Sequence, residues 1–161
     1  MKQRAFTIRL TEYDRLEELP GPQVGLVNRA VEAATKAYAP YSGYQVGAAV
    51  ELENGEVITG NNQENAAYPS GLCAERVALF YAGSRYPDVP PKSVAVAAIQ
   101  NGEIQEQPVT PCGGCRQVLY ESENRGGQPL EVILYGTKKI QVLQSASDLL
   151  PLPYESLVIS R

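Results

Sequence analysis

The sequence has no histidine and only three cysteines, Cys73, Cys112 and Cys115, among its 161 residues. Any zinc site must therefore be built without imidazole. A structural zinc site is closed by four soft ligands, and this chain has no fourth one to offer. An odd, small number of cysteines also argues against a secreted disulfide scaffold. We therefore expect a reducing, cytoplasmic location in which the thiols stay available as ligands.

Long apolar runs and clustered positive charge are absent as well. The N-terminus has no apolar run long enough for a signal peptide, and no stretch of the chain has the pattern of a transmembrane helix. The 14 Lys and Arg residues are scattered and the net charge is −4. A general nucleic-acid binder needs a cationic stripe that displaces phosphate counterions. We expect no membrane and no nucleic-acid partner, and a small uncharged ligand instead.

The length and the placement of proline and glycine predict one catalytic domain behind a short extension. A chain of 161 residues with 43% apolar and 20% charged residues is typical of a single globular domain. Residues 1–22 form the predicted extension, in which Phe6, Ile8 and Leu10 alternate as in a short strand. Pro20-Gly21-Pro22 then interrupts the chain. We place the catalytic domain at residues 23–161.

Alternating helical and strand patterns predict an α/β fold. Helices are expected over 24–38, 73–82 and 112–123, and strands over 46–52, 57–60, 94–99, 130–135 and 140–143. Asn54-Gly55 between the first two strands is a hairpin signal. This order predicts a three-layer α/β/α arrangement, with a mixed five-stranded sheet and helices on both of its faces. Both cysteine motifs fall where a loop or strand gives way to a helix.

The cysteines lie in two short motifs, Cys73-Ala74-Glu75 and Pro111-Cys112-Gly113-Gly114-Cys115. A catalytic zinc site uses three protein ligands and keeps a position for water. A glutamate two residues beyond the first thiol is suitably placed for a proton shuttle. The helix N-termini should favour thiolates. Because three thiolates carry excess negative charge, we expect Arg76 to donate hydrogen bonds to a ligand sulfur.

Each part of this pattern has another interpretation when it is taken alone. A single cysteine is usually a small buried apolar residue, and Cys-x-x-Cys in a cytosolic chain is also typical of a redox pair. A glutamate in a first helical turn is favourable without any catalytic role. A redox pair would leave Cys73 and Glu75 without a shared purpose, whereas the two motifs together match the zinc deaminase signature.

Four motifs resemble the cytidine deaminase family, specifically its small homotetrameric branch with three cysteines. They are Pro40-Tyr-Ser-Gly-Tyr-Gln-Val-Gly-Ala-Ala49, Asn62-Gln-Glu-Asn-Ala-Ala-Tyr68, Cys73-Ala-Glu-Arg76 and Pro111-Cys-Gly-Gly-Cys-Arg-Gln117. The resemblance implies one Zn²⁺ per subunit on Cys73, Cys112 and Cys115. It implies that Glu75 carries a proton from a zinc-activated water to the pyrimidine and the departing amine. The implied reaction converts cytidine, and 2′-deoxycytidine, to uridine or deoxyuridine plus ammonia in pyrimidine salvage.

The resemblance also implies a nucleoside pocket shared between subunits. Asn62 and Glu64 match the pair that holds the ribose 3′-hydroxyl, and the backbone near Ala74 would hold the pyrimidine carbonyl. Tyr44 stands where the family usually has a Phe that lines the base pocket. Tyr154 stands near the position of a Phe that stacks on the base from a neighbouring subunit. Taken alone, Asn62 and Glu64 could be ordinary polar residues of a loop. Taken alone, Tyr44 and Tyr154 could each be a residue that packs in the core or on the surface.

Other functions stay open at this point. A deaminase of another cytosine-like nucleoside or nucleobase would use the same zinc centre, although the Asn62–Glu64 pair favours a ribosyl substrate. A polynucleotide cytidine editor would need a basic groove, against which the net charge of −4 argues. A non-enzymatic zinc or thiol-redox module would need a fourth ligand, which a carboxylate could supply.

Overall fold

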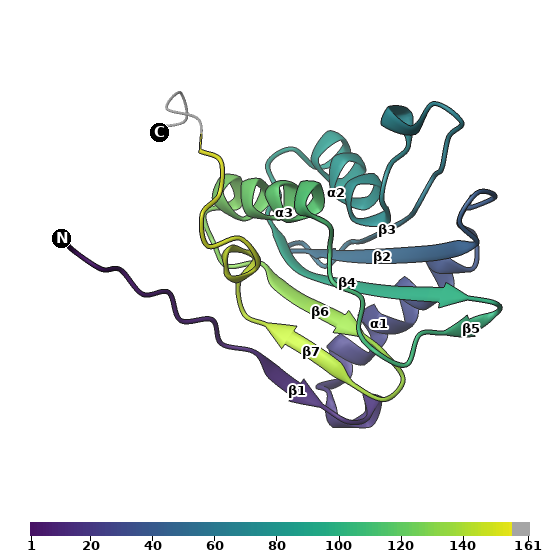
Figure 1. Ribbon diagram of the computed structural model, residues 1–161, viewed down its shortest axis with the longest axis horizontal. Coiled ribbons are helices and arrows are strands. Elements are labelled where there is room, and N and C mark those ends of the chain that lie inside the picture. Colours follow the sequence, from purple (N-terminus) through teal and green to yellow (C-terminus); the bar gives the residue numbers. More distant parts are fainter. Residues whose placement is uncertain (156–161) are drawn as a thin grey trace.

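The computed structural model describes residues 1–155 and shows a mixed β-sheet between two layers of helices (Figure 1). The strands are β1 (Thr11–Tyr13), β2 (Tyr44–Leu52), β3 (Val57–Asn61), β4 (Pro91–Gln100), β5 (Glu103–Ile104), β6 (Glu131–Tyr135) and β7 (Ile140–Leu143). Their order across the sheet is β1-β7-β6-β4-β2-β3, and β5 also pairs with β4. β4 and β6 are parallel, and the other described pairs are antiparallel.

The helices divide between the two faces of the sheet (Figure 1). Helix α1 (Gly21–Ala34) covers one face, and helices α2 (Ala74–Arg85) and α3 (Gly113–Gly126) lie together on the other. Three short 3-10 helices are η1 (Leu16–Glu18), η2 (Tyr68–Ser70) and η3 (Ala146–Leu149). Val27 and Ile133 belong to the buried cluster on the α1 side, whereas Ala78, Val96 and Leu119 belong to the cluster under α2 and α3. The predicted α/β fold with helices on both faces is confirmed.

The sheet has seven strands and not the five that we expected. The additional strands, β1 and β5, have three and two residues, which is too short for an apolar period to show in the sequence. β5 forms because Asn101 and Gly102 both have positive φ values, 56° and 79°, and return the chain directly onto β4. Such a two-residue turn favours Asn-Gly, so this pair is a hairpin signal of the same kind as Asn54-Gly55.

The strand expected around Phe6, Ile8 and Leu10 is wrong. The chain pairs with β7 only at Thr11–Tyr13, and the three apolar side chains are about half exposed. Alternation indicates one apolar face, but a strand also needs a backbone partner. β7 has only four residues, three of which are already paired with β1. The predicted extension therefore adds one short strand to the sheet, while the domain boundary at residue 22 stays a prediction.

Helix α1 begins and ends earlier than the apolar spacing indicated. It starts at Gly21 and includes Pro22 in its first turn, where a missing N–H costs nothing because the first turn has no partner for it. The helix ends at Ala34, and Tyr38 lies beyond it in an isolated bridge to Gln63. The residues predicted as a break are thus a helix start. No helix within residues 1–155 is both long and apolar enough to cross a bilayer.

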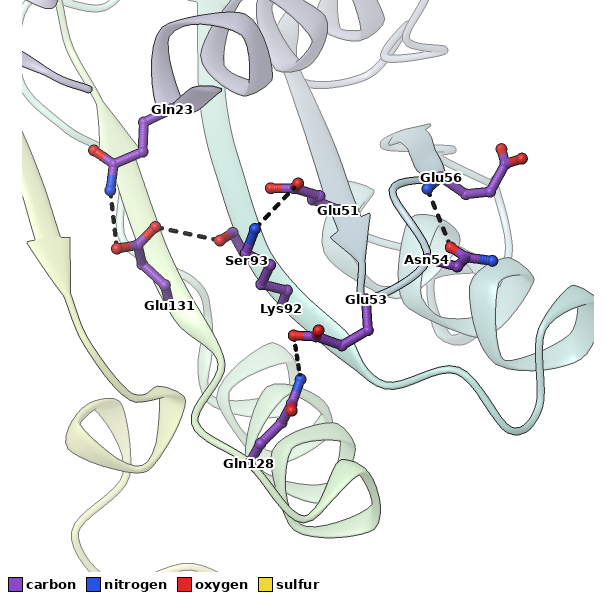
Figure 2. Close-up of polar contacts among 9 residues, drawn as sticks. All are labelled: Gln23, Glu51, Glu53, Asn54, Glu56, Lys92, Ser93, Gln128 and Glu131. Carbon is purple, nitrogen blue, oxygen red and sulfur yellow. Dashed lines mark hydrogen bonds and ion pairs between the residues drawn. The ribbon is translucent and has the colours of Figure 1, made fainter. Parts of the chain in front are cut away.

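A polar network lies at the edge of the sheet where β2 ends and β4 and β6 begin (Figure 2). Gln23 Nε2 in the first turn of α1 donates to Glu131 Oε2 at 2.9 Å, and Ser93 Oγ donates to Glu131 Oε1 at 3.2 Å. Lys92 Nζ lies 3.4 Å from Glu51 Oε1. The hydrogen bonds of Glu131 link α1 to β4 and β6, and the Lys92–Glu51 pair links β4 to β2. None of the predicted site residues takes part in these contacts.

Candidate active site

The three cysteines converge at the N-termini of α2 and α3. Cys73 and Cys112 are the N-cap residues of these helices, and Cys115 lies in the first turn of α3. Because the two helices lie side by side (Figure 1), motifs 39 residues apart come into contact. All three Sγ atoms lie within 4.8 Å of one another, and Cys73 Sγ is 3.9 Å from Cys112 Sγ.

The spacing of the sulfurs fits a metal ion and not a disulfide. Tetrahedral Zn–S bonds of about 2.3 Å place sulfurs about 3.8 Å apart, whereas a disulfide holds them at about 2.05 Å. All three cysteines are free thiols. Cys115 is buried, Cys73 is half-buried and Cys112 is exposed, so one side of the cluster faces solvent. The donor set therefore suits a soft divalent cation that a small molecule in solution can reach.

The local charges favour a thiolate at Cys73. A hydrogen bond from the Cys115 thiol lowers the pKa of Cys73 to about 5, burial opposes this change, and Arg76 adds to it. Arg76 Nη2 donates to Cys73 Sγ at 3.5 Å. The same sharing of a proton, together with burial, raises the pKa of Cys115. A divalent cation at this position would displace the shared proton, since metal ligands bind as thiolates.

Glu75 is a buried carboxyl beside the cysteines. It is the second residue of α2, is only 4% exposed, and follows the fully buried Ala74. Burial raises the pKa of Glu75, and the nearby Cys73 thiolate raises it further. A carboxyl group shifted toward neutral pH is suited to both accept and return a proton.

A cavity of about 520 Å³ opens next to the cysteine cluster. Cys73 and Arg76 of α2 line one side, and Asn62 and Glu64 from the segment after β3 line another. Pockets that bind small organic molecules usually have about 300–1,000 Å³. The structure therefore brings four of the predicted site residues to one cavity of suitable size.

Asn62 already holds the start of β2 in place. Its Oδ1 accepts from the backbone N–H of Val46 at 2.7 Å, and its Nδ2 donates to the carbonyl of Tyr44 at 2.9 Å. A carboxamide has two donors and two lone pairs, so one hydrogen and one lone pair of Asn62 are left for a ligand. Its orientation toward the cavity is thereby determined by the strand.

Glu64 is held by the loop that precedes β2. Ser42 Oγ and the backbone N–H of Tyr41 donate to its carboxylate, the latter at 2.8 Å. The hydrogen bond from Ser42 lowers the pKa of Glu64, so this carboxylate is an ionised acceptor at neutral pH. Ser42 was not among the predicted site residues. A hydroxyl in a loop becomes a candidate only when folding places it beside an acid 22 residues away.

The two predicted tyrosines lie outside the lining of this cavity. Tyr44 begins β2 and is half-buried, which raises the pKa of its phenol. Tyr154 is 77% exposed, and its backbone is held by Gln117, which accepts from its N–H at 3.0 Å and donates to its carbonyl at 2.8 Å. Within a single chain, Tyr154 therefore does not join the other candidate residues.

Known proteins are similar to this chain in sequence and in fold. Residues 23–126 match the family model described as the cytidine and deoxycytidylate deaminase zinc-binding region. A cytidine deaminase from Halalkalibacterium halodurans is 46% identical over 96 residues, which cover 60% of this chain and 68% of the relative. One from Mycobacterium tuberculosis is 39% identical over 109 residues, which cover 65% of this chain and 72% of the relative.

Solved structures agree with these sequence matches. A cytidine deaminase from Burkholderia pseudomallei superposes with a TM-score of 0.69 at 40% identity, covering 81% of this chain and 97% of that one. The cytidine deaminase from Mycobacterium tuberculosis gives a TM-score of 0.64 at 32% identity, covering 82% and 96%. Because the family model matches residues 23–126 and solved cytidine deaminases share the fold, the chain belongs to the cytidine and deoxycytidylate deaminase family.

Proposed function

We propose that this protein is a zinc-dependent hydrolase that deaminates cytidine and 2′-deoxycytidine to uridine and deoxyuridine, and that it serves pyrimidine salvage in the cytoplasm. One observation carries the proposal. Three sulfurs lie within 4.8 Å of one another beside the buried carboxyl of Glu75, and one of them, that of Cys73, belongs to a residue that lines a cavity of about 520 Å³. This arrangement provides a metal, a proton carrier and a place for a nucleoside within one site.

Cys73, Cys112 and Cys115 would hold one Zn²⁺ per subunit. The bound ion would supply an activated water as the nucleophile at neutral pH. Arg76 supports this role because it donates to the sulfur of Cys73 and so balances part of the negative charge of the thiolates. A less negative donor set leaves the metal a stronger Lewis acid.

Glu75 would carry the proton through the reaction. Its carboxylate accepts a proton from the attacking water as oxygen bonds to C4 of the pyrimidine, and the same group protonates N3. Glu75 would then take the second proton of the former water from the oxygen on C4 and deliver it to the amine. The C4–N bond breaks, ammonia leaves and the C4 carbonyl forms. Its burial supports this role, because burial raises the pKa of Glu75 and so makes the carboxylate a better proton acceptor than an ordinary one.

The cavity residues favour a nucleoside as substrate. The remaining donor and acceptor of Asn62 and the ionised carboxylate of Glu64 would bracket the ribose 3′-hydroxyl. A carboxylate at this position would repel a phosphate, so the nucleoside is preferred over its nucleotide. The backbone at Ala74 would hold the pyrimidine carbonyl, and Tyr44 would approach the base from the start of β2.

A homotetramer would complete each site. The exposed ring of Tyr154 supports this assembly, because its backbone is held by Gln117 while the side chain is presented outward from its own chain. In the assembly it would stack on the base held by a neighbouring subunit. Sedimentation or light scattering of the purified protein tests the oligomeric state directly.

Metal analysis and an activity screen on the same preparation test the proposed function. We expect about one zinc per subunit. Cytidine and deoxycytidine should release ammonia, whereas cytosine, adenosine, guanine and cytidine monophosphate should not. A chelator should abolish turnover and added zinc should restore it. Activity on free bases alone, or salt-dependent binding to RNA or single-stranded DNA with editing, would overturn the nucleoside assignment.

A further inference from the structure

Arg116, the residue after Cys115, joins three main-chain positions. Its Nε donates to the carbonyl of Pro111 at 2.9 Å, and its Nη1 donates to the carbonyl of Leu149 at 3.3 Å. Its own backbone N–H donates to the carbonyl of Cys112 at 2.9 Å. The same residue therefore holds both carbonyls at the start of the cysteine turn and ties them to the chain 33 residues further on.

The charge of Arg116 strengthens these contacts. Among the described residues Arg116 forms no ion pair with a carboxylate. Its guanidinium instead faces two carbonyl oxygens, and hydrogen bonds from an ionised donor are about twice as strong as those between neutral groups. The planar fork of arginine suits this task, because it presents several donors in one rigid geometry.

The turn between Pro111 and Cys115 has little other support. Cys112, Gly113 and Gly114 are exposed, and a Cβ at either glycine would meet nothing within 4 Å. Two glycines in succession also have the largest backbone freedom of any residue type. Only the two ends of the turn, Pro111 and Cys115, are buried. The hydrogen bond of Arg116 to the Pro111 carbonyl therefore holds this exposed turn at the residue next to Cys112.

We propose that Arg116 is a positioning residue for the metal ligands. By tying the carbonyl of Pro111 to Leu149 at the end of η3, it keeps the sulfur of Cys112 at the distance from Cys73 and Cys115 that a metal ion needs. The C-terminal segment thus contributes to metal affinity through Leu149 without touching the metal. This inference rests on the proposed function, because it takes the three sulfurs to be zinc ligands.

The test measures zinc affinity and not only activity. Metal-stripped protein is titrated with zinc against a chromophoric chelator, and the melting temperature of the metal-free form is recorded. Arg116→Ala should lower zinc affinity about 10- to 100-fold, the usual effect of removing a group that orients metal ligands. Arg116→Lys should give an intermediate loss, because an ammonium group cannot span both carbonyls.

Gln117→Ala is the matched control. Gln117 is the next residue of α3 and also bonds the C-terminal segment, but its side-chain hydrogen bonds within residues 1–155 go to the backbone of Tyr154 and not to Pro111. Its substitution should leave zinc affinity unchanged. An equal loss in both alanine variants would show that general docking of the segment is responsible, and would overturn the role assigned to Arg116.

Two further outcomes are decisive. Wild-type zinc affinity in Arg116→Ala would also overturn the inference. If Arg116→Ala fails to fold, Arg116→Lys decides, since an intermediate affinity supports the inference and wild-type affinity contradicts it. A wild-type protein that binds no zinc at all would instead refute the proposed function, so the two failures are distinguishable.

Discussion

The two helix N-termini that carry the cysteines are held in place by different forces. At α2 the cause is packing. Gly60 of β3 lies so close that a Cβ would come within 2.5 Å of Ala78 N and 2.7 Å of Ala74 O, and both alanines are fully buried. At α3, whose Leu119 is also fully buried, hydrogen bonds of Arg116 near the N-terminus and of Glu123 near the C-terminus add to the packing.

This difference indicates which part of the site is rigid. Close packing leaves few alternative positions, because a shift of even one methylene group is resisted by the surrounding atoms. Hydrogen bonds at a partly exposed turn depend on geometry and on the ionisation of their partners. The packed helix carries Cys73, a proposed zinc ligand, and Glu75, the proposed proton carrier. The hydrogen-bonded helix carries Cys112 and Cys115, whose placement depends on polar side chains.

The largest effect is expected on turnover, from a substitution on α2 that removes the proton-carrying group and leaves the packing unchanged. Glu75→Gln should lower kcat about 10²–10⁴-fold, because the amide has nearly the same size but cannot carry the proton. Zinc content, measured by metal analysis, and the circular dichroism spectrum should stay as in the wild type. A variant that retains substantial turnover would refute the role of Glu75.

The second-largest effect is expected from a substitution that disrupts the packing between β3 and α2. Gly60→Ala should cost about 3 kcal/mol of unfolding free energy, because the new methyl group meets backbone atoms that cannot rotate away. Zinc affinity should fall as well, since the N-terminus of α2 must move with Cys73. Urea unfolding and a zinc titration measure the two effects. Wild-type stability in this variant would show that α2 is not held as tightly as its contacts indicate.

The stability of the hydrogen-bonded side should depend on pH through Glu123. Glu123 is 8% exposed and accepts from the backbone N–H groups of Leu130 and Ala146, both at 2.8 Å, and from the hydroxyls of Ser145 and Ser147. Burial opposes its ionisation, but these hydrogen bonds outweigh burial and lower the pKa of Glu123 below its ordinary value of 4.5.

The sign of the pH effect follows from this lowered pKa. The stabilisation by Glu123 is fully present above its ordinary pKa and is lost as pH falls through its lower value in the folded protein. Glu123→Gln should therefore be about 2 kcal/mol less stable than the wild type at neutral pH, with a smaller deficit in acid. Urea unfolding of both proteins between pH 7 and about pH 3 checks this. A deficit that does not change with pH would contradict it.

The smallest effect on stability is expected at Gly114, where a side chain has room that is missing at Gly60. Gly114→Ala should raise the unfolding free energy by about 0.4–1 kcal/mol, because a Cβ there meets nothing within 4 Å and alanine reduces the freedom of the unfolded chain. Thermal unfolding of the metal-free protein measures it. Destabilisation similar to that of Gly60→Ala would show that the α3 turn is packed after all.

Much of the local structure could be predicted because its causes lie within a few residues. The Asn54-Gly55 hairpin joins β2 and β3 as expected, since Gly55 adopts the positive φ of 84° that the turn requires. The helix starts at both cysteine motifs were also expected and are confirmed at Ala74 and Gly113. Short strands such as β1 and β5 were not expected, because pairing partners and not local pattern create them.

The sequence by itself determined which chemical groups are available: three thiols without imidazole, an acid two residues after the first thiol, and an arginine after each motif. Tertiary structure decided which of them meet. Three hydrogen-bonded pairs join residues more than twenty positions apart in the sequence. They are Ser42 with Glu64, Gln117 with Tyr154, and Arg116 with Leu149. Such contacts depend on how helices and loops pack on a common sheet, and no local pattern in the chain encodes that distance.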